Sequence, residues 1–117
     1  FLDAERVSGF DLFAKYADIE KCVKACDVVV TGEGKFDITD MHGKGPFELV
    51  KLALRHKKQA WILCGQSEVD ENGLKAMGIA GAKIGQILPL APNAVEAQNR
   101  APKFLSALAK EFASKLK

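Results

Sequence analysis

Residues 27–46 have the sequence D-V-V-V-T-G-E-G-K-F-D-I-T-D-M-H-G-K-G-P. The β-branched run Val28–Val30 is short and continuously apolar, which is typical of a strand buried on both faces. We expect this strand to stop at Thr31 and to open into a loop at Gly32-Glu33-Gly34, because glycines permit unusual backbone angles and let a ligand approach the main chain. Ligands of open parallel sheets bind at the carboxyl ends of the strands, so we place the chemistry here.

Acidic and basic side chains follow this strand closely. Glu33 and Asp37 are the first two carboxylates, and Asp40 and His42 come next. Gly43-Lys44-Gly45-Pro46 then begins a helix, since proline suits the first helical turn. Helix-start N–H groups beside a lysine cation favour an anionic ligand. Carboxylates, a cation and a helix start are what phosphoryl transfer needs, because that reaction depends on positioning and charge stabilisation.

Two common nucleotide-binding motifs do not match. The segment G-E-G-K-F-D begins like G-x-G-x-x-G, but Asp37 replaces the third glycine, and an acidic loop would repel a pyrophosphate. The segment H-G-K-G is not a Walker A loop, because Ile38 stands at its first glycine and Gly45 at its Ser or Thr. Glu33 or Asp37 could hold magnesium through water, orient a substrate hydroxyl or take its proton. A phosphatase or carboxylate-binding site would use similar parts, so these functions stay open.

The bulk composition indicates one modest soluble domain. The chain has 117 residues and a net charge of +2, too small to suggest nucleic acid or a membrane surface as a partner. No apolar run approaches the ~20 residues that span a bilayer. The chain begins with Phe1 rather than Met, so we expect it to be part of a longer protein.

The three cysteines are odd in number and lack the spacing of a disulfide framework. They indicate a reducing compartment, and we expect a cytoplasmic protein. A zinc site could use Cys22 and Cys26, but no second ligand pair accompanies them. The alternative is that all three are small buried side chains.

The remaining pattern alternates helices and strands. After a helix capped by Ser8 and another that begins near Asp18, the strand at residue 28 starts an order of β-α-β-α-β-α. We expect helices at Pro46–Lys57 and at Asp70–Met77, the second of which Gly78 closes, then a helix that starts at Asn93 and a last helix that reaches Leu116. We expect strands at Ala60–Cys64, followed by a polar loop at residues 65–67, and at Ala82–Leu88. This order predicts an α/β fold, a three-layer Rossmann-like parallel sheet with helices on both faces. Three strands leave open edges, and we expect further strands elsewhere in a larger two-domain enzyme.

The segment T-G-E-G-K-F-D-x-x-x-x-H-G-K-x-P, Thr31 to Pro46, resembles the signature of the bacterial glycerate kinases, including glycerate 2-kinases. Ser8-Gly9-Phe10-Asp11, the strand before Ser67 and the segment from Gly78 to Pro89 also resemble that family. The resemblance implies an enzyme that uses ATP and Mg²⁺ to phosphorylate D-glycerate. It implies that residues 1–117 are the C-terminal part of a Rossmann-like domain that faces a second domain across a cleft.

Glu33, Asp37, Gly43 and Lys44 match positions of the family motif directly. We expect Glu33 and Asp37 to be catalytic, and substrate or phosphate to be bound by Thr31, Gly32, Gly34, Lys35, His42, Gly43 and Lys44. No metal site is expected from the protein alone, although Glu33 or Asp37 could contribute to a Mg²⁺ site.

The sequence departs from the family at two positions. Thr39 replaces the usual Gln and Asp40 the usual Thr or Ser, which puts the substrate in question. We expect the missing N-terminal portion of the same protein to complete the cleft, so the chain alone should lack robust kinase activity and its open sheet edge should favour association. The alternatives are a non-catalytic nucleotide- or small-acid-binding domain, a phosphatase and a kinase for another hydroxy acid.

Overall fold

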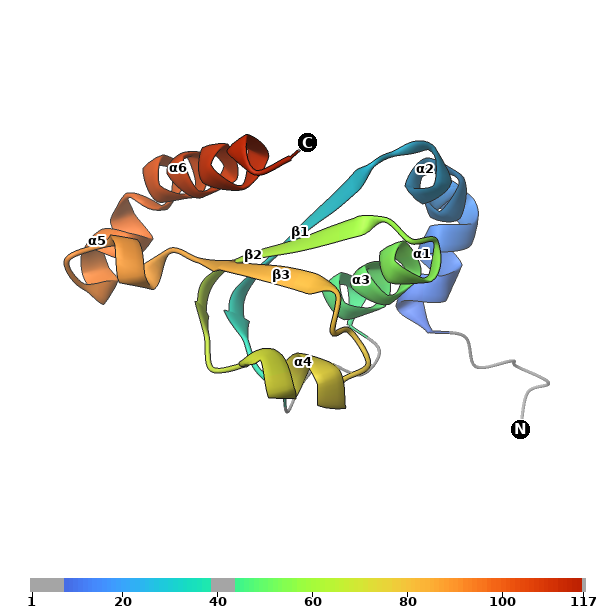
Figure 1. Ribbon diagram of the computed structural model, residues 1–117, viewed down its shortest axis with the longest axis horizontal. Helices are drawn as coiled ribbons and strands as arrows, with labels where there is room; N and C mark the ends of the chain where they lie inside the picture. The colour runs from blue at the N-terminus through green and yellow to red at the C-terminus, as the bar shows by residue number, and fades with distance from the viewer. Residues whose placement is uncertain (1–7, 39–43, 117) are drawn as a thin grey trace.

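The computed structural model describes residues 8–38 and 44–116. It is an α/β fold with a parallel sheet in the order β1-β2-β3 (Figure 1). The strands are β1 (Val28–Phe36), β2 (Gln59–Ser67) and β3 (Ala82–Gln86). Val28 pairs with Gln59, and Ala60 pairs with Ala82. The alternating pattern therefore predicted the parallel sheet and its three strands correctly.

Three of the described helices begin at short polar side chains that accept a backbone N–H group. Ser8, Asp70 and Asn93 each accept the N–H three residues later, at 3.0, 2.8 and 2.9 Å. A helix does begin directly after Asp18, as expected, but Asp18 lies between two helices with φ 52° and its side chain makes no such bond. The helices are α1 (Gly9–Ala17), α2 (Ile19–Ala25), α3 (Gly45–Arg55), α4 (Glu71–Ala76), α5 (Ala94–Asn99) and α6 (Ala101–Ser114), with a 3-10 turn η1 (Leu88–Leu90).

Helices cover both faces of the sheet, as predicted. Figure 1 shows α3 and α4 on one side and α6 on the other. Phe47 of α3 and Leu74 of α4 share a buried core with Ile62 of β2. On the other face, the rings of Trp61 and Phe112 meet edge to face with centroids 5.2 Å apart. The strands thus lie between two helical layers, and their parallel pairing places all three carboxyl ends at the same edge of the sheet.

The helical layer formed by α6 covers less of the sheet than the sequence suggested. Helix α6 packs on β2, and Leu108 fills the space over Gly85 of β3. Val30 on β1 stays 52% exposed, so the prediction that this strand is buried on both faces is wrong. Within the described residues β1 pairs with one strand only, which leaves its outer edge open. None of the described helices is long and apolar enough to cross a membrane.

Two expected loops are strand. β1 continues through Gly32-Glu33-Gly34 to Phe36, and β2 continues through residues 65–67 to Ser67. The two extensions pair with each other, as in Lys35 with Gln66. Glycine has low strand propensity, but here the ladder of main-chain hydrogen bonds outweighs it. Gly65 also fits where other residues would not, because an added Cβ would stand 2.5 Å from the carbonyl oxygen of Gly34. The polar residues are therefore held on rigid strands rather than on loops.

Candidate active site

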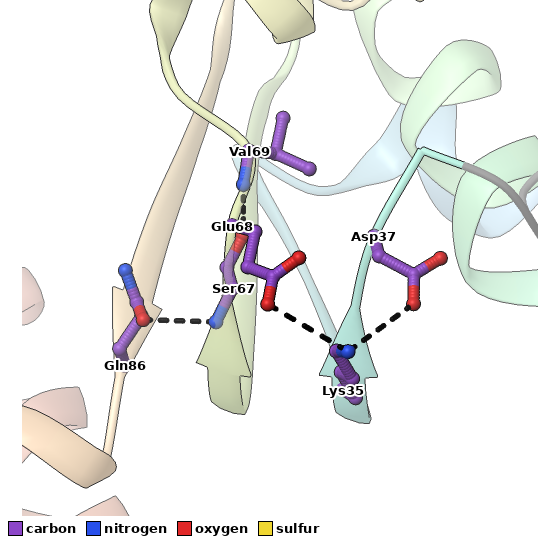
Figure 2. Close-up of polar contacts among 6 residues, drawn as sticks. All are labelled: Lys35, Asp37, Ser67, Glu68, Val69 and Gln86. Carbon is purple, nitrogen blue, oxygen red and sulfur yellow. Dashed lines mark hydrogen bonds and ion pairs between the residues drawn. The ribbon is translucent and has the colours of Figure 1, made fainter.

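An ionic cluster lies at the carboxyl ends of β1 and β2. The Lys35 Nζ is 4.0 Å from Asp37 Oδ2 and 3.8 Å from Glu68 Oε1, and Figure 2 shows the lysine between the two carboxylates. Asp37 directly follows β1 and Glu68 directly follows β2, so the register of the two strands brings them together. Half-exposed ion pairs at these distances stabilise a fold by at most ~1 kcal/mol. The cluster is thus accessible to a ligand and changes the fold's stability little.

A second set of hydrogen bonds fixes the end of β2. The side-chain Oε1 of Gln86, at the end of β3, accepts the Ser67 N–H at 2.8 Å (Figure 2). The Ser67 hydroxyl accepts the Val69 N–H at 3.0 Å, so Ser67 turns the chain directly after β2. These bonds hold the segment that carries Glu68. Sequence reasoning missed both Glu68 and Gln86, although their place just after or at a strand's carboxyl end was the available indication.

Lys44 lies at the start of α3. It is the N-cap residue, with an extended backbone (φ −79°, ψ 140°), and its side chain is exposed. Pro46 occupies the first turn, as predicted. Because α3 follows β1 in the chain, the start of α3 lies near the carboxyl-end edge of the sheet. Thr39, Asp40, His42 and Gly43 fall outside the described residues, so their predicted roles are not tested.

A cavity of about 950 Å³ opens over the carboxyl halves of β1 and β2, beside α5 and α6. Of the predicted residues, Thr31, Gly32, Glu33 and Gly34 line it, while Lys35, Asp37 and Lys44 do not. Its other lining residues are Val30, Leu63, Cys64, Gly65, Gln66, Ile87, Leu88, Ala94, Ala97, Gln98, Ala101 and Leu105. The structure thus divides the predicted site into a cavity and a neighbouring ionic cluster.

The cysteines do not share one environment. Cys64 is buried, Cys26 is half-buried and Cys22 is exposed, so the expectation of three buried side chains is wrong for Cys22. Burial raises the pKa of the Cys64 thiol to about 11. In residues 8–38 and 44–116, no three His, Cys, Asp or Glu side chains gather in a group that could hold a metal ion. Mg²⁺ often needs only one or two carboxylates plus substrate phosphates and water, and Asp37 and Glu68 suit that arrangement.

Comparison with known proteins shows the family of this chain. The model of the glycerate kinase family matches residues 1–117. The chain belongs to the glycerate kinase family. No solved structure matches it.

Proteins that resemble this chain come from several bacteria. A glycerate kinase of Bacillus subtilis is 28% identical over 117 residues, which are all of this chain and 30% of the relative. A glycerate 2-kinase of Escherichia coli is 30% identical over 79 residues, which are 68% of this chain and 21% of the relative. An uncharacterized protein of Synechocystis, slr1840, is 33% identical over 89 residues, 76% of this chain and 24% of its own length. The chain therefore spans less than a third of the length of these relatives.

Proposed function

We propose that this chain is the part of an ATP-dependent D-glycerate kinase that carries one wall of its active site. The observation that supports the proposal most is the convergence of Lys35, Asp37 and Glu68 at the carboxyl ends of β1 and β2, with Lys44 at the start of α3. This is the edge at which parallel sheets bind ligands. Membership of the glycerate kinase family supports the choice of phosphoryl transfer to glycerate as the proposed reaction.

The side chains suit distinct tasks. Asp37 lies at the end of a strand and is partly exposed, so it can accept the proton of a substrate hydroxyl or contribute one oxygen to Mg²⁺. Lys35 and Lys44 are cations that suit a carboxylate and phosphates. Bound Mg²⁺ would neutralise charge on the transferred phosphoryl group. Glu33, on β1 and beside the cavity, is the second carboxylate of the proposed site.

The second wall of the cleft is proposed to come from the rest of the protein. The relatives named as kinases are more than three times as long as the segment they share with this chain. Phosphoryl transfer needs both reactants enclosed and positioned, and an open sheet edge does neither. We therefore expect the 117-residue chain alone to have little kinase activity.

The test is a coupled ADP-release assay on the full-length product of the gene, with D-glycerate and Mg-ATP. We expect turnover that falls by at least about a hundredfold in Asp37→Asn, because a positioned acid–base group contributes ~10²–10⁴. Lys44→Ala should raise KM for an anionic substrate and lower kcat. Lys83→Ala removes an exposed lysine of β3 outside the site and is the matched control.

The outcomes separate the alternatives. Loss of activity in both site variants but not in the control supports a glycerate kinase. A folded full-length protein that binds ATP without turning over D-glycerate contradicts the proposal. A screen of other hydroxy acids and of phosphate esters then distinguishes another kinase, a phosphatase and a non-catalytic binding domain.

A further inference from the structure

The strand β3 ends before its neighbour β2 does. The last residue of β3, Gln86, pairs with Cys64, and the Ile87 N–H donates to the Cys64 carbonyl oxygen at 2.9 Å. The chain then enters η1, whereas β2 continues to Ser67. In the register of these two described strands, residues 65–67 have no partner on β3. This extension of β2 leads directly into the ionic cluster, so its support on the β3 side affects the site.

The side chain of Gln86 takes the place of the missing length of strand. Its Oε1 accepts the Ser67 N–H at 2.8 Å (Figure 2). A main-chain N–H can only donate, so the amide oxygen and not the amide nitrogen must face it. The bond therefore requires a side chain of this length with an oxygen at its end. Glutamate meets that requirement, whereas methionine has a similar length but only a weak acceptor.

Glu68 lies between two residues that hydrogen bonds hold. Ser67, before it, is held by Gln86. Val69, after it, is 8% exposed and donates its N–H to the Ser67 hydroxyl at 3.0 Å. The Glu68 side chain is itself 74% exposed, so solvent surrounds most of it. The position of Glu68 is therefore set by the backbone on either side of it, and through Ser67 by Gln86.

The register of β1 and β2 makes the position of Glu68 important. Phe36 pairs with Ser67, so the residues that follow this last pair on the two strands are Asp37 and Glu68. Neighbouring carboxylates repel each other unless a cation lies between them. Lys35 is that cation, with its Nζ 3.8 Å from Glu68 and 4.0 Å from Asp37. Both distances exceed that of a hydrogen bond, so these carboxylates leave the three ammonium donors to an anionic ligand.

A displaced Glu68 would change this arrangement. Lys35 would keep Asp37 as its nearer carboxylate and could close to the ~2.8 Å of a charge-assisted hydrogen bond with it. Such a pair would occupy a donor of the lysine and an oxygen of the aspartate, both of which the proposed reaction uses. Misplacing a group of an active site by about 1 Å can lower a rate ~10²-fold.

We propose that Gln86 is a positioning residue of this site: through its bond to Ser67 it keeps Glu68 in the ionic cluster. Lys35 is thereby shared between two carboxylates instead of pairing with Asp37 alone. This inference rests on the proposed function for the reaction that the cluster serves. Gln86 lies two strands away from β1, which is ~10 Å, so it acts through β2 and is not itself a catalytic residue.

The test compares variants of Gln86 in the full-length protein by the ADP-release assay. Gln86→Met removes the acceptor, and we expect kcat/KM for D-glycerate to fall by at least about tenfold. Gln86→Glu keeps an oxygen for the Ser67 N–H and should stay within about threefold of the wild type, since about 0.15 M salt largely screens the added charge at that distance. Gln59→Met, at the exposed start of β2, is the matched control and should change nothing.

A double-mutant cycle shows whether Gln86 acts through Glu68. In Glu68→Gln the cluster has already lost one carboxylate, so adding Gln86→Met should change kcat/KM by less than about twofold. Additive effects would mean that the substitution damages the sheet in general, and they would overturn the inference. Full activity in folded Gln86→Met, or no rescue by Gln86→Glu, would overturn it as well. Gln86→Lys, which is polar but has no acceptor, decides the question if Gln86→Met does not fold by circular dichroism.

Hydrogen exchange separates this inference from the proposed function, because it needs no turnover. The Val69 N–H bonds to Ser67 and not to Gln86, so its exchange reports on the turn that carries Glu68. It should exchange at least about tenfold faster in Gln86→Met and at the wild-type rate in Gln86→Glu. If the rates behave so in a protein that does not phosphorylate D-glycerate, the positioning stands and the kinase fails. If D-glycerate is phosphorylated but Gln86→Met leaves the Val69 rate unchanged, the positioning fails and the kinase stands.

Discussion

Gly65 of β2 lies against the main chain of Gly34 on β1. A methyl group on Gly65 would stand 2.5 Å from the carbonyl oxygen of Gly34 and 3.6 Å from its carbonyl carbon. These are atoms of a paired strand, so no side chain can rotate away and the strands themselves must separate. We predict that Gly65→Ala destabilises the end of the sheet that carries Lys35 and Asp37.

The size of the effect follows from two opposing contributions. Forcing an extra methyl group into a closely packed region costs about 1–3 kcal/mol. Replacing glycine reduces the entropy of the unfolded chain, which returns about 0.4–1 kcal/mol. The free energy of unfolding should therefore fall by about 1–2 kcal/mol in Gly65→Ala. At roughly 4 °C per kcal/mol for a domain of this size, Tm should fall by about 4–8 °C.

Gly34→Ala is the matched control, because it makes the same substitution on the adjacent strand. Its methyl group meets no atom within 4 Å, and Gly34 does not have a positive φ. This variant should be stabilised by about 0.4–1 kcal/mol. Thermal and urea unfolding followed by circular dichroism measure both values. If the two variants change Tm in the same direction and by the same amount, the contact between main chains is not what requires glycine at position 65.

Three further predictions concern ionisation and capping. Since burial raises the Cys64 pKa from 9.0 to about 11, the free energy of unfolding should fall as pH rises through that interval. Urea unfolding of Cys64→Ala should not show this decrease with pH. Iodoacetamide at pH 8 should label the exposed Cys22 before the buried Cys64. The hydrogen bond from His56 lowers the Glu20 pKa below 4.5, so this pair should stabilise the fold above pH 4.5. The stabilisation should be lost as pH falls through the lowered pKa. In Glu20→Gln the free energy of unfolding should change less with pH over that acidic range. Asp70→Ala removes the α4 cap and should cost about 1 kcal/mol in urea unfolding, whereas an unchanged midpoint would contradict the capping role.

Local chemistry predicted most of the fold. The apolar run at Val28 and the apolar faces of the helices predicted the alternation of strands and helices along the chain. Ser8, Asp70 and Asn93 predicted helix starts, because a cap depends on residues only three positions apart. Gly78, with φ 75°, lies just after α4 as its pattern indicated.

The lengths of β1 and β2 could not be predicted in the same way. Their extensions are rich in glycine and polar residues, and they are strand because they pair with each other across the sheet. Such pairing depends on residues far apart in the sequence. For the same reason the sequence identified Lys35 and Asp37 but not Glu68, which joins them through the β1–β2 register. The exposure of Val30 depends on how far α6 reaches, and no local pattern records that.

The order β1-β2-β3 also has a consequence for synthesis on the ribosome. Each strand pairs with the strand made just before it, so a growing chain can add β2 to β1 once α3 has emerged, and then add β3 to β2. Of the three described strands, none must be inserted between two others that have already paired. Helix α6, which follows all three strands in the chain, then covers Gly85 and Trp61. Until it emerges, that face of the nascent sheet exposes apolar side chains, and this is the interval in which a chaperone would be most useful.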